Sequence, residues 1–339
     1  MGFPGRMLAL LAGVIALHPA PVLAGQGAPA AAAPAAIIND LPILGLAQVS
    51  IKVSDLAKAR HFYGNVLGFA EAFTILDKAG RISSLYMKVN DEQFVELIPV
   101  ETIELVRQTR LVIQSSNLAA LHRIYAEKGL QPGPISIGPD GNPLFRMLAP
   151  NGFPLDFIEY APGSRQTRLK GKLLDAKRIS GRLLHAGTMV RDDATKAFFQ
   201  SLGWGKLLPG GRGDYIETPA TDRNLETKNP PLDPNDPATL GQYTREVHGA
   251  VYHFALEIGD MHAAREQLKR RGGYDDVRLR AAVGNNRHWL IHLFDLDGSR
   301  VELMSRDKVA DDIPAFSVMP PGPPAKPILA TQRGVYPWP

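Results

Sequence analysis

The sequence predicts an α+β fold of four β-α-β-β-β units in two pairs, and three repeated features predict it. Four stretches combine a short strand, a polar break and an amphipathic helix, and they begin at Gln48, Arg110, His185 and His253. An Asp or Asn stands seven positions after each of these residues. Each unit then closes with an apolar strand that contains an acidic residue. The same order of features in all four stretches indicates one duplicated unit.

Each predicted helix has a start and a stop signal. The side chain at the start can accept hydrogen bonds from the free amides of the first turn. These N-cap residues are Asp55, Asn117, Asp192 and Asp260. Glycines that favour a helix end follow at Gly68, Gly129, Gly203 and Gly272. An apolar stripe along residues 56–66 predicts that the first helix packs on a sheet.

The closing strands carry one acidic residue each. These are Glu96, Asp156, Glu217 and Glu302, at 41, 39, 25 and 42 positions after the respective N-caps. Three units therefore match, whereas the third is about fifteen residues shorter. Since that length is roughly one β-hairpin, we expect the third unit to have a shortened sheet.

The last unit ends in a predicted hairpin. One strand runs from His288 to Phe294, a turn covers residues 295–298, and the return strand runs from Arg300 to Met304. Because side chains alternate along a strand, His288 and His292 share a face with Leu290, opposite Trp289, Ile291 and Leu293. Glu302 is expected on the polar face. This asymmetry predicts a sheet with one face against helices and the other lining a polar cup.

Length and composition fit an ordinary globular protein of two domains. The chain has 339 residues, of which 45% are hydrophobic and 21% charged, with a net charge of +4 and no cysteine. Without a dense basic cluster beside aromatic residues, no nucleic-acid binding is expected. Folding is expected without disulfides.

The chain ends are predicted to lie outside the two domains. Residues 1–24 read as a secretory signal peptide, which predicts an exported protein, periplasmic or secreted, with no stable membrane insertion after cleavage. An Ala/Pro-rich tether covers residues 25–43. A Pro-rich tail covers residues 307–339. Between them we expect domains at 44–162 and 182–306, joined by a linker at 163–181, in a monomer or a homodimer.

The paired units, with VSDL, FYGNVLGF, VELI and DGSRVELM, resemble the vicinal oxygen chelate superfamily of glyoxalases, bleomycin-resistance proteins and extradiol ring-cleaving dioxygenases. The resemblance covers residues 44–306. It implies that paired modules curl their mixed sheets into open cups with helices on the outside. It also implies that metal ligands come from the first and last strands of the units.

The matching positions of the two halves differ in chemistry. In the first half they are Gln48, Glu96, Arg110 and Asp156. In the second half they are His185, Glu217, His253 and Glu302. Imidazole and carboxylate suit Fe, Zn, Mn or Ni as divalent ions, whereas a guanidinium repels cations. We therefore expect a metal in the second half and a polar cluster without a metal in the first.

Three further roles are expected around this site. Whether Glu217 joins the ligands stays open. If it does, the site is the two-His, two-Glu type of glyoxalase-like enzymes, in which the ion acts as a Lewis acid and a carboxylate shuttles a proton. His292 stands ten residues before Glu302, where the dioxygenase-like family has Tyr, so it is a proton carrier or a group that orients a ligand. His288 and Arg287 are expected to face the substrate.

The leading functional hypothesis is a divalent-metal-dependent enzyme that binds a small molecule through two adjacent oxygens. Ring-cleaving dioxygenase and lyase or isomerase chemistry both stay open. The alternative is a small-molecule binding protein of the bleomycin-resistance type without turnover. A structural surface protein with a vestigial cup is a third hypothesis.

Overall fold

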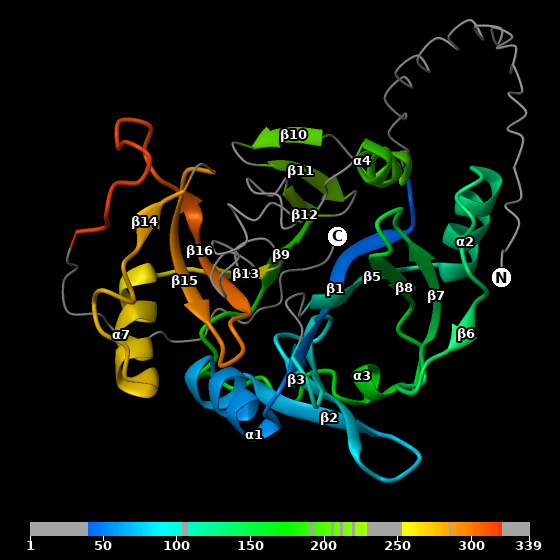
Figure 1. Ribbon diagram of the computed structural model, residues 1–339, viewed down its shortest axis with the longest axis horizontal. Coiled ribbons are helices and arrows are strands. Elements are labelled where there is room, and N and C mark those ends of the chain that lie inside the picture. Colours follow the sequence, from blue (N-terminus) through cyan, green and yellow to red (C-terminus); the bar gives the residue numbers. More distant parts are fainter. Residues whose placement is uncertain are drawn as a thin grey trace, which may run out of the picture. The chain divides into compact units, whose positions relative to one another are not determined.

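The computed structural model describes residues 40–103, 108–189, 193–204, 207–210, 213–218, 221–228, 253–284 and 286–320, and between 207 and 228 it describes only the course of the backbone. These residues all belong to one compact unit, Ala35–Pro339. They form two curled, mixed eight-stranded sheets with few helices, so the predicted α+β class is confirmed (Figure 1). No helix of the described residues is both long enough and apolar enough to cross a membrane.

The first sheet has the strand order β2-β3-β4-β1-β5-β8-β7-β6. Its strands are β1 (Ile43–Val53), β2 (Ala70–Leu76), β3 (Ile82–Lys88), β4 (Phe94–Pro99), β5 (Gln108–Ser115), β6 (Ser136–Ile137), β7 (Pro143–Leu148) and β8 (Pro154–Ile158). The two central strands β1 and β5 are antiparallel, and each also pairs in parallel with the last strand of its own unit. One sheet thus contains the first two of the predicted β-α-β-β-β stretches.

The second sheet repeats this order as β10-β11-β12-β9-β13-β16-β15-β14. Its strands are β9 (Leu183–Met189), β10 (Leu207–Gly210), β11 (Gly213–Thr218), β12 (Thr221–Lys228), β13 (His253–Ile258), β14 (Ala282–Val283), β15 (His288–Phe294) and β16 (Arg300–Lys308). The predicted final hairpin is present as β15 and β16, joined by a turn in which Gly298 has a φ of 81°.

The helices are α1 (Leu56–Ala59) with a π-helical continuation η1 (Arg60–Val66), α2 (Leu118–Glu127), α3 (Arg165–Arg168), α4 (Asp193–Ser201) and α7 (Met261–Gly272). Asp55, Asn117 and Asp260 cap α1, α2 and α7 as predicted, each accepting a hydrogen bond from an amide three residues on. Asp192 lies outside the described residues. Helix α7 ends at the predicted Gly272, and the left-handed cap residue is the following Gly273.

The third unit is not missing a hairpin, contrary to the sequence prediction. Strands β10, β11 and β12 form the same antiparallel set as β2, β3 and β4, and β12 pairs in parallel with β9. The prediction was wrong because it took Glu217 as the acid of the last strand of the unit, whereas Glu217 lies in the middle strand β11. The last strand of the unit is β12, and it carries a different acid, Glu226.

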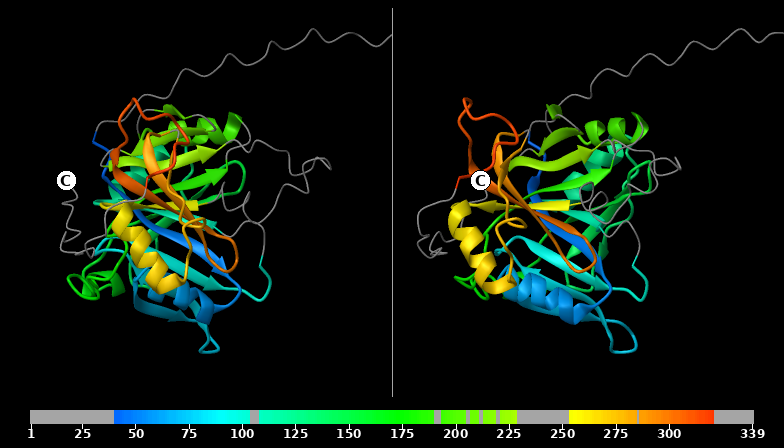
Figure 2. Two further views of the ribbon diagram at one scale, coloured as in Figure 1. Left: turned by 90° about the vertical axis from the view of Figure 1, so that its left-hand side faces the viewer. Right: turned by 60° about the vertical axis from the view of Figure 1, so that its left-hand side comes forward.

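One hydrophobic core joins the two halves on the side of the sheets opposite the cups. Val49 of β1, Tyr63 of η1 and Phe254 of β13 belong to it, and the Tyr63 and Phe254 rings stack at 6.5 Å. The indole of Trp204 donates a 2.7 Å hydrogen bond to Tyr125 across the halves. Helices α1 and α7 lie side by side against this region (Figure 2).

Polar contacts at the linker also join the halves. The Gln93 side chain donates to the carbonyls of Leu46 and Leu183 and accepts from the amide of Leu183. At the tip of the last hairpin, Asp297 accepts hydrogen bonds from the amide and hydroxyl of Ser54. These bonds hold the second sheet at a defined position on the first.

Candidate metal centre

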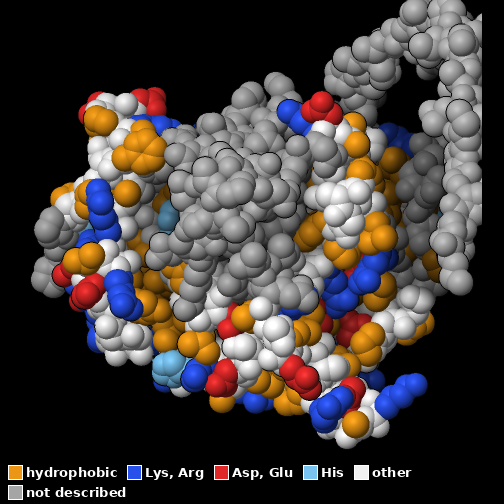
Figure 3. All heavy atoms as spheres, viewed as in Figure 1, with side chains coloured by type: hydrophobic (Ala, Val, Ile, Leu, Met, Phe, Trp, Pro, Cys, Tyr) orange, Lys and Arg blue, Asp and Glu red, His pale blue; other side chains and the backbone are white. Residues whose placement is uncertain are grey.

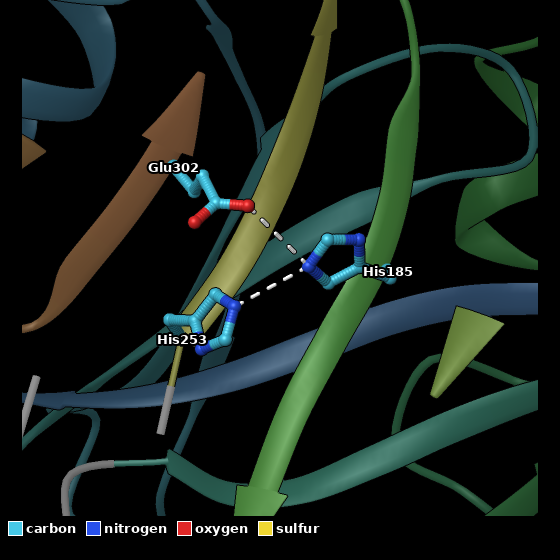
Figure 4. Close-up of side chains that lie close together, drawn as sticks. All are labelled: His185, His253 and Glu302. Atoms are coloured by element: carbon cyan, nitrogen blue, oxygen red, sulfur yellow. Dashed lines mark hydrogen bonds and ion pairs between the residues drawn. The ribbon is translucent and has the colours of Figure 1, made fainter. Parts of the chain in front are cut away.

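The strand register brings two imidazoles and a carboxylate of the second sheet together. In the pairing of β9 with β13 and of β13 with β16, Ala255 lies between His185 and Glu302. His253 stands two residues before Ala255 and therefore on the same face. The side chains of His185, His253 and Glu302 point toward one another from three adjacent strands (Figure 4). This polar face is called the second cup below.

The spacing of the donor atoms suits a metal ion. Nε2 of His185 lies 3.3 Å from Nε2 of His253 and 3.7 Å from Oε1 of Glu302. All three donors lie within 4.8 Å of one another, and all three residues are buried. Ligands at ~2.0–2.2 Å from one ion are themselves roughly 3.0–3.6 Å apart. The three residues could therefore hold a divalent cation with little movement.

Glu302 is ionised despite its burial. Burial by itself raises the pKa of a carboxyl, but Arg300, the hydrogen bond from His292 and the two imidazoles hold the pKa of Glu302 well below its usual range. A carboxylate that is charged at neutral pH is the form that coordinates metals.

Arg300 is a part of this site that the sequence analysis did not single out. It is 5% exposed and pairs in register with His253, and its Nη2 lies 3.2 Å from Oε2 of Glu302. This contact is an ion pair without hydrogen-bond geometry. Because residues two apart in a strand share a face, the position of Arg300 beside Glu302 could have been read from DGSRVELM.

His292 stands at the open side of the cluster. The register pairs it with Glu302, and its Nε2 lies 3.1 Å from Oε2 of that carboxylate. The His292 side chain is 43% exposed, whereas those of His185 and Glu302 are nearly inaccessible. His292 is therefore accessible to solvent while it contacts Glu302.

His288 and Arg287 contact the C-terminal part of the second sheet. Nδ1 of His288 lies 2.7 Å from the carbonyl of Ser305, and Arg287 donates to the carbonyls of Ala310 and Ile313. His288 is four residues from His292, which is about 13 Å along a strand. The His288 contact lies within β16, and the Arg287 contacts hold the chain that follows this strand. A role toward substrate stays a prediction for both residues.

The register replaces Glu217 by Glu226 as the counterpart of Glu96. Glu96 pairs with Ser50, two residues after Gln48, and Glu226 pairs with Gly187, two residues after His185. The side chain of Glu217 lies outside the described residues, so its coordination of a metal stays a prediction. The sequence signal for Glu226 was its place shortly before residues 229–243, a stretch with four prolines that is expected to end the unit.

The first sheet carries arginines where the second carries histidines. Val112 lies between Gln48 and Asp156 in register, which makes Gln48, Arg110 and Asp156 the counterparts of His185, His253 and Glu302. Arg146 pairs with Asp156 as His292 pairs with Glu302. The polar face formed by Gln48, Glu96, Arg110 and Asp156 is called the first cup below.

Solved structures share this fold at low sequence identity. No family model and no curated protein sequence matches the chain. An extradiol ring-cleaving dioxygenase from B. fuscum is 18% identical, with a TM-score of 0.54 over 85% of this chain and 77% of that one. A homoprotocatechuate 2,3-dioxygenase from Arthrobacter globiformis is 18% identical, with a TM-score of 0.53 over 78% and 81%.

A second kind of protein has the same fold. The Mn(II)-bound glyoxalase from Novosphingobium aromaticivorans is 17% identical, with a TM-score of 0.55 over 87% of this chain and 92% of that one. Extradiol dioxygenases and glyoxalases are the kinds of protein that the sequence resemblance named. At these identities the similarity shows the fold, and the chemistry has to be argued from the residues.

Proposed function

We propose that the protein is an exported, divalent-metal-dependent enzyme in which His185, His253 and Glu302 hold the ion. The observation that carries this proposal is the convergence of three buried donors in the second cup. Two imidazoles and one carboxylate leave open positions at a metal, as in facial-triad sites for Fe(II). Fe, Mn, Zn or Ni all suit such a donor set.

The proposed substrate is a small molecule that offers two adjacent oxygens. When bound, the metal supplies Lewis acidity toward those oxygens. Arg300 keeps Glu302 ionised, and His292 accepts or donates a proton at Nε2 at the exposed edge. Ring cleavage with O₂ and lyase or isomerase chemistry are both consistent with these parts, and the names of the structural neighbours support the same two reactions.

Metal content tests this proposal directly. We expect the purified full chain, loaded with Fe²⁺ or Mn²⁺ and desalted, to retain about one equivalent of metal by mass spectrometry. His185→Ala and Glu302→Ala should lose most of it, whereas His61→Ala, a change at an exposed imidazole of η1, should retain it. Equal metal content in all four proteins would refute the proposed ligands.

The second candidate is a binding protein without turnover. The first cup favours it, because an arginine replaces an imidazole there and the cup is still polar and hollow. For the whole chain this candidate requires that the second cup bind no metal. The same metal analysis therefore separates the two functions.

Export is also a proposal, and it rests on the apolar run and small residues of the first 24 positions. The mass of the mature chain provides the test. A chain that begins at Gly25 supports cleavage after Ala24, and a chain that retains Met7–Leu17 contradicts it.

A further inference from the structure

The first cup contains a cavity of about 250 Å³. Its polar lining includes Gln48, Glu96, Arg110 and Asp156, and its apolar lining includes Ile75 and Leu144. On this side of the molecule, basic and acidic side chains over β5, β7 and β8 lie among hydrophobic ones (Figure 3). The cavity belongs to the half for which no metal is expected.

The polar lining of the cavity, called the floor below, has charged groups that form hydrogen bonds and ion pairs with one another. Glu96 accepts hydrogen bonds from Gln48, Ser50, Tyr86 and Arg110. Asp156 accepts two from Arg146 and lies 3.4 Å from Nη1 of Arg110. Two guanidinium groups therefore balance two buried carboxylates, and the floor needs no ion from outside.

A further carboxylate makes the cavity unfavourable for anions. Asp140 lines the cavity and is 6% exposed. Its oxygens accept hydrogen bonds from Asn142 and Gln166, which are neutral. The lining thus has three carboxylates and one guanidinium, and even with Arg146, which binds Asp156 beside the cavity, the negative charges exceed the positive ones by one. An entering anion would therefore meet net repulsion.

Apolar residues flank the polar floor on two sides and are not part of the main core. One cluster contains Val112 and Ile158 with Leu144, and the other contains Ile75 and Tyr86 with Phe73. The Phe73 ring stacks on Tyr86 at 4.3 Å and fixes its position. Because Tyr86 donates its proton to Glu96, its oxygen can accept a hydrogen bond from a ligand.

We propose that the first cup is a second ligand site, which binds a small uncharged ring compound with a hydroxyl group and needs no metal. A cavity of 150 Å³ holds benzene, so about 250 Å³ has room for one substituted ring. The apolar clusters contact the faces of the ring, and the hydroxyl binds at the polar floor. This site does not depend on the function proposed for the second cup.

Fluorine NMR titration of the full chain with 4-fluorophenol tests the proposal. We expect saturable binding with a dissociation constant below roughly 5 mM. The anion 4-fluorobenzoate should bind at least about 10-fold more weakly. His185→Ala should bind 4-fluorophenol as wild type does, because the change affects only the second cup.

Filling the cavity provides the decisive variant. Leu144→Trp should weaken 4-fluorophenol binding at least about 10-fold. The control Ile137→Trp adds the same ring on the same sheet at a side chain that is 70% exposed, and it should bind as wild type does. If Leu144→Trp does not fold, Ser84→Phe fills the cavity from β3.

Three results would overturn the proposal. The first is that wild type shows no saturable binding at 4-fluorophenol concentrations up to 10-fold above the expected dissociation constant. The second is that a folded cavity-filling variant binds 4-fluorophenol as tightly as wild type. The third is that His185→Ala no longer binds it. The last would assign the phenol to the second cup. None of these results bears on the metal content of the wild-type protein, so this proposal and the proposed function fail independently.

Discussion

Single residues at matching register positions give the two halves different chemistry. His253 and Arg110 occupy the same place in their sheets, and so do His292 and Arg146. An imidazole has a lone pair for a metal or a proton, whereas a guanidinium has only donors and a permanent charge. The first half therefore balances its carboxylates internally, and the second half keeps donors available.

The residue that most directly tests proton transfer is His292. We expect His292→Asn to retain metal and to lower turnover about 10²–10⁴-fold on any substrate that the wild type converts. The physical reason is that an asparagine amide cannot carry a proton at neutral pH, whereas an imidazole can. His61→Asn is the matched control. Turnover within 3-fold of wild type, with an unchanged pH profile, would leave His292 without that role.

At the scale of elements, the last hairpin connects the second sheet to the first half. In its turn, Asp295 accepts hydrogen bonds from the amides of Asp297 and Ser299 and from the hydroxyl of Tyr63. Burial is the main cause that raises the pKa of Asp295 to about 6. The hairpin thus brings a titratable carboxyl into the interface between the halves.

This turn predicts a pH-dependent stability. Unfolded, Asp295 titrates near 3.9, and folded near 6, so the folded protein holds its proton more tightly. The contribution of Asp295 to the free energy of unfolding is therefore fully present below about pH 4. It is lost as the pH rises through about 6, and the total loss is up to about 3 kcal/mol. We expect the free energy of unfolding of Asp295→Asn, relative to wild type, to rise over that window.

Urea unfolding at pH 4, 5, 6 and 7 measures this difference. The asparagine side chain of the variant can accept the same amide bonds, so the two proteins should be closest in stability at pH 4. Asp276→Asn, at a fully exposed carboxylate whose pKa is lowered by its hydrogen bond from Lys269, should show no gain in this window. A difference between wild type and Asp295→Asn that is constant with pH would contradict the burial of a charge.

Much of the element pattern could be predicted from the sequence, because N-caps, alternation and the hairpin turn are local signals. The prediction failed where pairing decides the result. Glu226 was missed because only the pairing of β12 with β9 shows which acid closes the third unit.

At the scale of the whole described unit, the halves share one hydrophobic core. Tyr125 and Phe157 of the first half surround Trp204 of the second, and Tyr63 stacks on Phe254. The sequence indicated two similar halves, but it could not show this packing, because the contacts join residues about 50 to 190 positions apart. Neither sheet has a separate core of comparable size among the described residues.

The shared core predicts that both halves unfold together. We expect Phe254→Ala to lower the free energy of unfolding by about 3–5 kcal/mol, because it removes a fully buried ring. Calorimetry should still show one transition, at a lower temperature. Phe316→Ala, at a side chain that is 68% exposed, should change stability by less than about 0.5 kcal/mol. Two calorimetric transitions, of which only one shifts in temperature in Phe254→Ala, would show that the halves unfold independently.

The ion pairs of Arg110 with Glu96 and Asp156 have a consequence for how the protein depends on its surroundings. Arg110 is part of the polypeptide from its synthesis, whereas a metal ion has to be bound from the surroundings afterwards. The first cup is therefore complete as soon as the polypeptide folds. Under the proposed function, scarcity of iron or manganese outside the cell would leave the second cup without its metal and therefore inactive, whereas the first cup would be unchanged.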